Sequence, residues 1–285
     1  MKERLSTYIS VLGKSVVVVI STMNFLLADI IKVEPPNWWT HFNDRKLELM
    51  VYGENVSKTE KVEISNSNNQ IVSSITVLDI KKTSNPNYIF IQLFLSKDLI
   101  PGDYTFNLIG KSNERFIYTF HEKKVDRNYA NGFNSSDVIY LLMPDRFSNG
   151  DQSNDFIEGL LAGTNRSKPG LRHGGDFQGI INNLDYLQEL GVTAIWMTPI
   201  FINDMPEIAG GYGDHVYGAY HGYASTDFYK VDPRFGTNDK YKELVEKVHE
   251  RDMKVVMDII HNHSGDKHWW VNDPPDSDWY NISDK

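Results

Sequence analysis

The spacing of apolar residues changes near residue 137 of this 285-residue chain, and this change constrains the fold more than any other feature. Before it, apolar and polar residues alternate over short runs, which is typical of strands with one buried face. The clearest runs are 46–52, 88–95, 104–109 and 114–120. They predict an immunoglobulin-like β-sandwich over residues 29–122. The polar, aperiodic residues 123–136 are expected to form a linker.

Beyond residue 137, continuous apolar runs alternate with helical patterns. The runs are 137–143, 192–197 and 254–260, and we expect each to be a strand of a parallel sheet buried on both faces. Apolar residues within 180–190 repeat at helical spacing and stop at Gly191, a residue that commonly ends helices. A second helix is predicted over 241–248, after a Thr237 cap. The order β-α-β-α-β indicates an α/β fold.

The N-terminus has the pattern of an export signal. Lys2 and Arg4 precede an apolar stretch at 15–28 that is short for a membrane span. We expect residues 1–28 to be a cleavable signal and the protein to be periplasmic or extracellular. An uncleaved anchor and a buried strand at 16–20 are the alternatives.

Composition excludes several classes of function. The chain has 38 Asp and Glu against 29 Lys and Arg, a formal charge of −9, so nucleic acid is not expected as a partner, because phosphate binding relies on surplus basic residues. It contains no cysteine, which excludes disulfides, thiolate metal sites and a cysteine nucleophile.

Polar residues follow the second and third predicted strands of the α/β half. Asp258, Asn262 and His263 lie at the end of the third, where parallel α/β folds gather reactive groups. The loop after the second contains His221 and Tyr223. A tyrosine ring offers an apolar face to a sugar, and histidine can bond its hydroxyls. The alternatives are an ordinary hydrogen-bonded loop and a loop that packs its own aromatic rings.

A third group is rich in oxygen. The segments 149–155 and 174–176 bring three carboxylates and two asparagine amides, enough with backbone carbonyls for the six to eight oxygen ligands of Ca²⁺. A solvated turn is the alternative, since Asn-Gly-Asp favours turns by itself.

Five blocks in this order resemble the α-amylase superfamily of glycoside hydrolases, most closely its neopullulanase and cyclomaltodextrinase branch. The blocks are 143–155, 174–179, 191–199, 220–223 with 232–236, and 258–263. The preceding sandwich, which opens with the Trp-containing segment 34–39, is similar to the N-terminal domain carried by cyclomaltodextrinase-type enzymes.

The resemblance implies a (β/α)₈ barrel that cleaves α-1,4- or α-1,6-glucan bonds with retention of configuration. It implies that Tyr223 stacks under a sugar, that His221 and His263 bond sugar hydroxyls, and that Asp258 orients a later arginine. The implied calcium ligands are Asn149, Asp151, Asn154, Asp155, Gly174 and Asp176. The implied partners are maltodextrin, cyclodextrin and pullulan, and a second copy of the chain in a homodimer.

The catalytic carboxylates of this family have no match here. The family's nucleophile lies in an Arg-x-Asp motif after the fourth barrel strand and its acid/base Glu after the fifth, but the chain contains no Arg-x-Asp. Residues 137–285 are also far fewer than the roughly 250 of a whole barrel. We therefore expect an N-terminal portion truncated after strand 3, with the start of the following insertion, and inactive on its own. The alternatives are a non-catalytic glucan-binding or partner protein and a degenerate reading frame.

Overall fold

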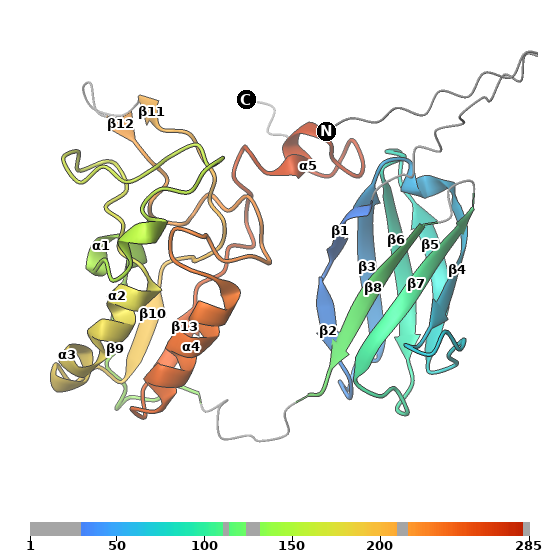
Figure 1. Cartoon of the computed structure of the whole chain (residues 1–285), viewed down its shortest axis with the longest axis horizontal. Coiled ribbons are helices and arrows are strands. Elements are labelled where there is room, and N and C mark those ends of the chain that lie inside the picture. Colours follow the sequence, from blue (N-terminus) through green and yellow to red (C-terminus); the bar gives the residue numbers. More distant parts are fainter. Residues whose placement is uncertain (1–29, 111–113, 124–131, 210–215, 282–285) are drawn as a thin grey trace, which may run out of the picture.

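The structure is a computed structural model that describes residues 30–110, 114–123, 132–209 and 216–281. The predicted signal at 1–28 lies outside the described residues, as does most of the predicted linker. In the part described, a two-sheet domain and a mixed α/β half lie side by side (Figure 1). No helix among the described residues is long and apolar enough to cross a membrane.

The N-terminal domain consists of two four-stranded sheets. The first has the order β1 (Ile30–Glu34), β3 (Lys46–Gly53), β6 (Tyr88–Leu95), β5 (Ile75–Lys82), with all neighbours antiparallel. The second has the order β2 (Asn37–Trp39), β8 (Glu114–His121), β7 (Gly102–Gly110), β4 (Thr59–Ser65), with only the β2–β8 pair parallel. A 3₁₀ turn, η1 (Val56–Lys58), precedes β4. All four runs predicted from alternation are strands.

One hydrophobic core joins the two sheets, because every second side chain of a strand points to the same face. Ile89, Ile91 and Leu93 of β6 are fully buried, and so is Phe106 of β7. Residues of both sheets belong to a single apolar cluster. The domain built on this core carries Lys32 and Tyr52, which contact the second half.

The second half contains a parallel sheet of three strands, as expected. Its order is β13 (Lys254–Met257), β10 (Ala194–Met197), β9 (Ile139–Leu142). The other elements are α1 (Pro144–Phe147), η3 (Gln152–Asn154), α2 (Phe177–Asn182), α3 (Leu184–Glu189), β11 (Ile208–Ala209), β12 (Val216–Tyr217), α4 (Asn238–His249) and α5 (Trp269–Asn272). The α4 helix begins with the predicted Thr237 cap, whose side chain accepts from the Lys240 amide.

The expectation of one helix over 180–190 was wrong, because the segment divides into α2 and α3. Asn183 leaves the helical conformation, with φ −116° and ψ 15°. Its side-chain amide donates to the Gly179 carbonyl at 2.7 Å and to the Ser148 hydroxyl at 3.2 Å. These bonds hold the chain in a turn that links α2 to the loop after β9.

The expectation that the three strands are buried on both faces was also wrong. Ile195 and Met197 pack against α2 and α4 in a single core. On the opposite face Leu141 is 60% exposed and Trp196 is 39% exposed. Helices cover only one side of this sheet in the described residues, so a continuous apolar run does not by itself mean burial on both sides.

Candidate functional site

The loops that follow β10 and β13 meet above the parallel sheet. Nε2 of His263 lies 2.8 Å from the carbonyl oxygen of Tyr223. A carbonyl can only accept, so this nitrogen carries the proton. The structure thus brings together the four predicted residues of these loops: His221, Tyr223, Asp258 and His263, referred to below as the loop cluster.

Tyr223 and Asp258 are joined directly. The Tyr223 hydroxyl donates to Oδ2 of Asp258 at 2.9 Å. Trp196 of β10 donates its indole N–H to the same oxygen at 3.2 Å. Burial and the hydrogen bond to the Asp258 carboxylate raise the pKa of Tyr223, so the phenol keeps its proton. Sequence reasoning missed Trp196, which lies on the exposed sheet face.

His221 completes the cluster. Its Nδ1 accepts from the Tyr223 amide at 2.9 Å, and the two rings stack with centroids 5.8 Å apart. Burial and the positive charge of Arg172 lower the pKa of His221 below its ordinary 6.5, so the ring is neutral at pH 7. Tyr223 remains 38% exposed. The cluster therefore presents an accessible aromatic ring beside a neutral imidazole.

A buried ion group supports the loop after β10. Arg234 donates to both oxygens of Asp232, at 2.8 and 2.7 Å, and Arg172 lies 3.3 Å from Oδ2. Burial raises the pKa of Asp232, but the two guanidinium groups outweigh it and hold the pKa below 3.8. Both arginines also donate to the Asn203 carbonyl. The group fixes the start of this loop, and sequence reasoning did not single it out.

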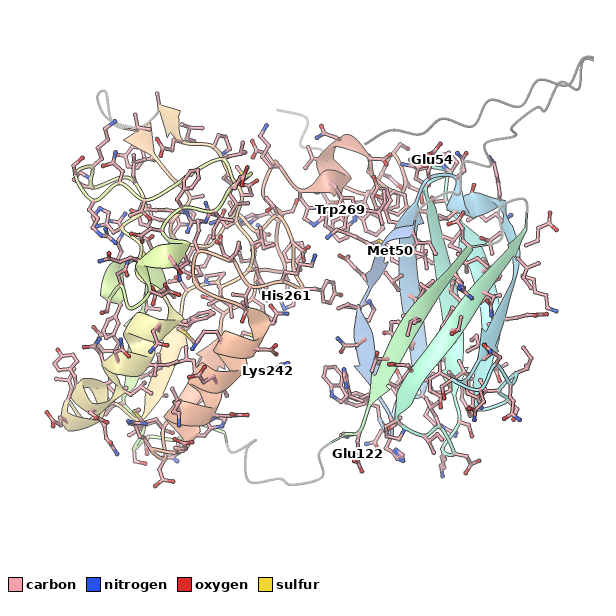
Figure 2. All side chains as sticks on the ribbon, viewed as in Figure 1. Met50, Glu54, Glu122, Lys242, His261 and Trp269 are labelled. Atoms are coloured by element: carbon pink, nitrogen blue, oxygen red, sulfur yellow. The ribbon has the colours of Figure 1, made fainter. Side chains whose placement is uncertain are left out.

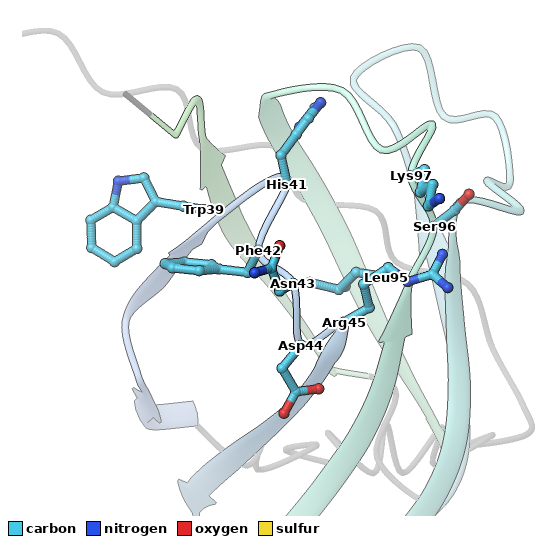
Figure 3. Close-up of a pocket in the computed structure, with 9 residues that line it drawn as sticks. All are labelled: Trp39, His41, Phe42, Asn43, Asp44, Arg45, Leu95, Ser96 and Lys97. Carbon is cyan, nitrogen blue, oxygen red and sulfur yellow. The ribbon is translucent and has the colours of Figure 1, made fainter. Parts of the chain in front are cut away.

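A cavity of about 930 Å³ lies beside the loop cluster and is lined by both halves of the molecule. Its walls include Glu34 of β1, Tyr229, His261, His263 and Trp270. Figure 2 shows His261 on the side of the α/β half that faces the sandwich. A smaller pocket of about 380 Å³ is built only from sandwich residues, with Trp39 and Phe42 among its walls (Figure 3).

The predicted oxygen cluster is partly organised by backbone amides. Asp176 caps α2 by accepting from Gly179 at 2.6 Å, and it also accepts from the amides of Gly150 and Asp151. Asp151 accepts from the amide and hydroxyl of Ser153 and caps η3. These two carboxylates therefore already stabilise helix starts.

The remaining predicted ligands have unused oxygens. The side-chain oxygens of Asn149 and Asn154 are buried without a hydrogen-bond partner, which is costly unless something else binds them. Asp155 accepts from Asn149 at 2.7 Å and pairs with Arg166 at 3.0 Å. Gly174 has φ 80°, and a Cβ there would collide with the Asp155 carboxylate.

To a cation that prefers oxygen ligands, this donor set offers the unpartnered amide oxygens of Asn149 and Asn154, the Gly174 carbonyl and the Asp155 carboxylate. No group of three or more His, Asp or Glu side chains within the described ranges is arranged to hold a metal. The two unpartnered amide oxygens are the feature that suits Ca²⁺, which accepts neutral oxygen ligands.

Family models match both halves of the molecule. The model for the α-amylase catalytic domain matches residues 141–284. The chain belongs to the α-amylase family. The model for the cyclomaltodextrinase N-terminal domain matches residues 32–124, which is the two-sheet domain. The resemblance inferred from the sequence motifs is confirmed.

Curated relatives within the α-amylase family support the same branch. The chain is 45% identical to the β/α-amylase of Paenibacillus polymyxa over 150 residues, 51% of this chain and 12% of that protein. It is 32% identical to the cyclomaltodextrinase of Thermoanaerobacter pseudethanolicus (strain ATCC 33223 / 39E) over 205 residues, which are 63% of this chain and 33% of that protein. It is 35% identical to neopullulanase 2 of Thermoactinomyces vulgaris over 158 residues, which are 52% of this chain and 24% of that protein. The chain thus spans a third or less of the length of each.

Proposed function

We propose that this chain supplies the sugar-binding wall of a glycoside hydrolase that acts on α-glucans. The observation that supports this most is the convergence of the loop cluster, where His263 contacts the Tyr223 backbone at 2.8 Å and Tyr223 bonds Asp258 at 2.9 Å. An α-glucan is a neutral chain with apolar ring faces and many hydroxyls. The exposed ring of Tyr223 suits the faces, and the imidazoles suit the hydroxyls.

The proposed substrates are maltodextrin, cyclodextrin and pullulan. The relatives named cyclomaltodextrinase and neopullulanase, together with the match to the cyclomaltodextrinase N-terminal domain, support this choice. The family likeness also supports a (β/α)₈ barrel around the three parallel strands and an immunoglobulin-like sandwich as parts of the proposal. Export through residues 1–28 is proposed from their basic start and apolar stretch. A homodimer completes the proposal.

Hydrolysis with retention requires two carboxyl groups about 5 to 5.5 Å apart. The chain has no Arg-x-Asp motif. We therefore propose that these residues bind sugar and that bond cleavage needs a carboxylate pair this chain does not contain.

A structural Ca²⁺ ion is part of the proposal. Asn149, Asn154, Asp155 and the Gly174 carbonyl would hold it, with Asp151 and Asp176 organising the surrounding backbone. Bound there, the ion would neutralise the carboxylate charge and tie the loop after β9 to the residues that precede α2.

Calorimetric titration with maltoheptaose tests the binding function. Tyr223→Ala should weaken the affinity about tenfold, which is the loss of roughly one stacking contact. Tyr186→Ala, at a tyrosine 55% exposed on α3, is the matched control and should bind like the wild type. Equal affinities of the wild type and Tyr223→Ala would refute the assignment of the loop cluster.

An assay of reducing-sugar release from maltodextrin tests the catalytic part. The purified chain should release no sugar above background. Release that Tyr223→Ala diminishes would show that a catalytic pair is present after all, and would exclude the non-catalytic alternative.

A further inference from the structure

Asp273, in the segment that follows β13, binds the sandwich through its carboxylate. Oδ2 of Asp273 accepts from the Tyr52 hydroxyl at 2.9 Å and from the side-chain amide of Asn87 at 3.1 Å. Oδ1 accepts from the side-chain amide of Asn85 at 2.5 Å. All three donors belong to the sandwich, on β3 and on the turn before β6. Asp273 thus uses both carboxylate oxygens to bind a different domain.

The chain from Asp273 to Asp276 is held by the same sandwich edge. The Tyr88 hydroxyl donates to the Asp273 carbonyl at 2.5 Å, and the Asn85 side chain donates to the Pro274 carbonyl at 2.8 Å. The Ser84 amide donates to Asp276 at 2.8 Å. So many polar contacts hold this segment close to the sandwich and also fix its orientation on it.

A second contact joins the sandwich to the loop after β10. Lys32 of β1 donates to Asp227 at 2.6 Å, and its ammonium lies 4.0 Å from the centre of the Trp269 ring. Asp227 belongs to the same loop as Tyr223, and Trp269 begins α5. Figure 2 shows Trp269 between the two halves of the molecule. One sandwich lysine therefore contacts both loops.

The two loops also contact each other between these ties. The Gly265 amide donates to the Ser225 carbonyl at 2.8 Å, and a Cβ at Gly265 would collide with the Ala224 carbonyl. The fully buried ring of His268 lies against both Phe228, at 5.4 Å, and Trp269, at 3.9 Å. These contacts form a continuous path from Asp273 through α5 to the segment that carries His263.

We propose that the sandwich is a clamp that sets the spacing of the two loops bearing Tyr223 and His263, with Asp273 and Lys32 as positioning residues. Neither residue belongs to the loop cluster. The clamp fixes the loops before a ligand arrives, which removes an ordering cost that binding would otherwise bear. The effect on sugar affinity rests on the proposed function. The effect on the spacing of the loops is independent of that function.

Hydrogen exchange of the whole chain, read by mass spectrometry, tests the clamp. In Asp273→Ala and Lys32→Met, amides in 219–228 and 261–268 should exchange about tenfold faster, because charge-assisted hydrogen bonds are lost. Amides in β6, β7 and α4 should keep their rates. Asp239→Ala, which removes only an exposed pair with Lys242, is the control. Wild-type rates in the loops, or equal acceleration everywhere, would overturn the proposal.

Tyr52→Phe provides a milder perturbation, since it removes one hydroxyl and keeps the ring. It should accelerate the same loop amides by a smaller factor. Tyr52→Phe combined with Asp273→Ala should exchange no faster than Asp273→Ala alone, because Asp273→Ala already removes the hydrogen bond that Tyr52→Phe removes. Fully additive effects would contradict the assignment of Asp273 as the receiving group.

The affinity for maltoheptaose separates this proposal from the function on which its last step rests. If the clamp positions the sugar-binding wall, Asp273→Ala weakens binding, and it has no further effect in a Tyr223→Ala background. Faster loop exchange in a chain that does not bind maltoheptaose would uphold the clamp and refute the sugar site. Unchanged loop exchange would refute the clamp whatever the affinity.

Discussion

Glu34 is a buried carboxyl at the junction of the two halves, and its ionisation should make stability depend on pH. It ends β1 with 9% of its surface exposed. Burial raises the pKa of Glu34 from 4.5 to about 7; Lys32, at 3.9 Å, lowers it and Asp227 raises it. The other titratable groups that interact with it are Tyr88 and Tyr229.

The direction of the effect follows from the raised pKa. The folded protein holds the Glu34 proton more tightly than the unfolded chain does, so stability falls as the pH rises from 4.5 to about 7. The distance between these pKa values corresponds to about 3 kcal/mol, at 1.36 kcal/mol per pKa unit. Below pH 4.5 the carboxyl is protonated in both states and this loss is absent.

Glu34→Gln removes the titrating group and keeps its shape. The free energy of unfolding should be similar in the variant and the wild type near pH 4.5, and about 3 kcal/mol higher in the variant above pH 7. Urea unfolding followed by tryptophan fluorescence at pH 5, 6, 7 and 8 measures the difference. Titration of the groups that do not interact with Glu34 is common to both proteins and cancels.

Glu60→Gln, at an exposed position of β4, is the matched control, and its difference from the wild type should stay flat across this range. A Glu34→Gln difference that is equal at pH 5 and pH 8 would refute the reasoning. So would a variant that becomes less stable than the wild type at high pH, because the attraction of Lys32 would then outweigh burial.

Three further outcomes test other parts of the structure. Asp232→Asn should cost about 3–5 kcal/mol of unfolding free energy in urea, because it leaves two buried guanidinium groups without a counter-charge; a loss below about 1 kcal/mol would contradict that role. Gly174→Ala should lower the melting temperature, since its φ of 80° and the nearby Asp155 carboxylate leave no room for a Cβ; an unchanged melting temperature would contradict it. Calcium should raise the melting temperature of the wild type but not of Asn154→Ala. A wild-type melting temperature that is the same with calcium and with chelator would refute the proposed Ca²⁺ site.

Strong local patterns made much of the fold predictable. The three parallel strands and α4 follow from apolar runs and from the Thr237 cap. The strands β1, β2, β4 and β5 of the sandwich were not predicted, because all four lie at sheet edges, and β5 has only Ile75 buried. Such strands are held by pairing with a neighbour, and that pairing leaves little trace in their own sequence.

The loop residues of the candidate site were predictable, but their surroundings were not. Motif resemblance identified Tyr223 and His263, and their positions after parallel strands placed them at one edge of the sheet. Trp196 was missed because, within an apolar run, it was indistinguishable from a core residue. Asp273 was missed because its partner Tyr52 is 221 positions away in the sequence, and a contact of that range has no local signature.

A crystal structure of the chain soaked with maltoheptaose would test the central claim most directly. We predict a glucosyl ring stacked on Tyr223, with hydroxyls within hydrogen-bond distance of His221 or His263. Sugar density confined to the sandwich pocket beside Trp39, or no density at a concentration that saturates binding in solution, would contradict the assignment of these loops as the sugar-binding wall.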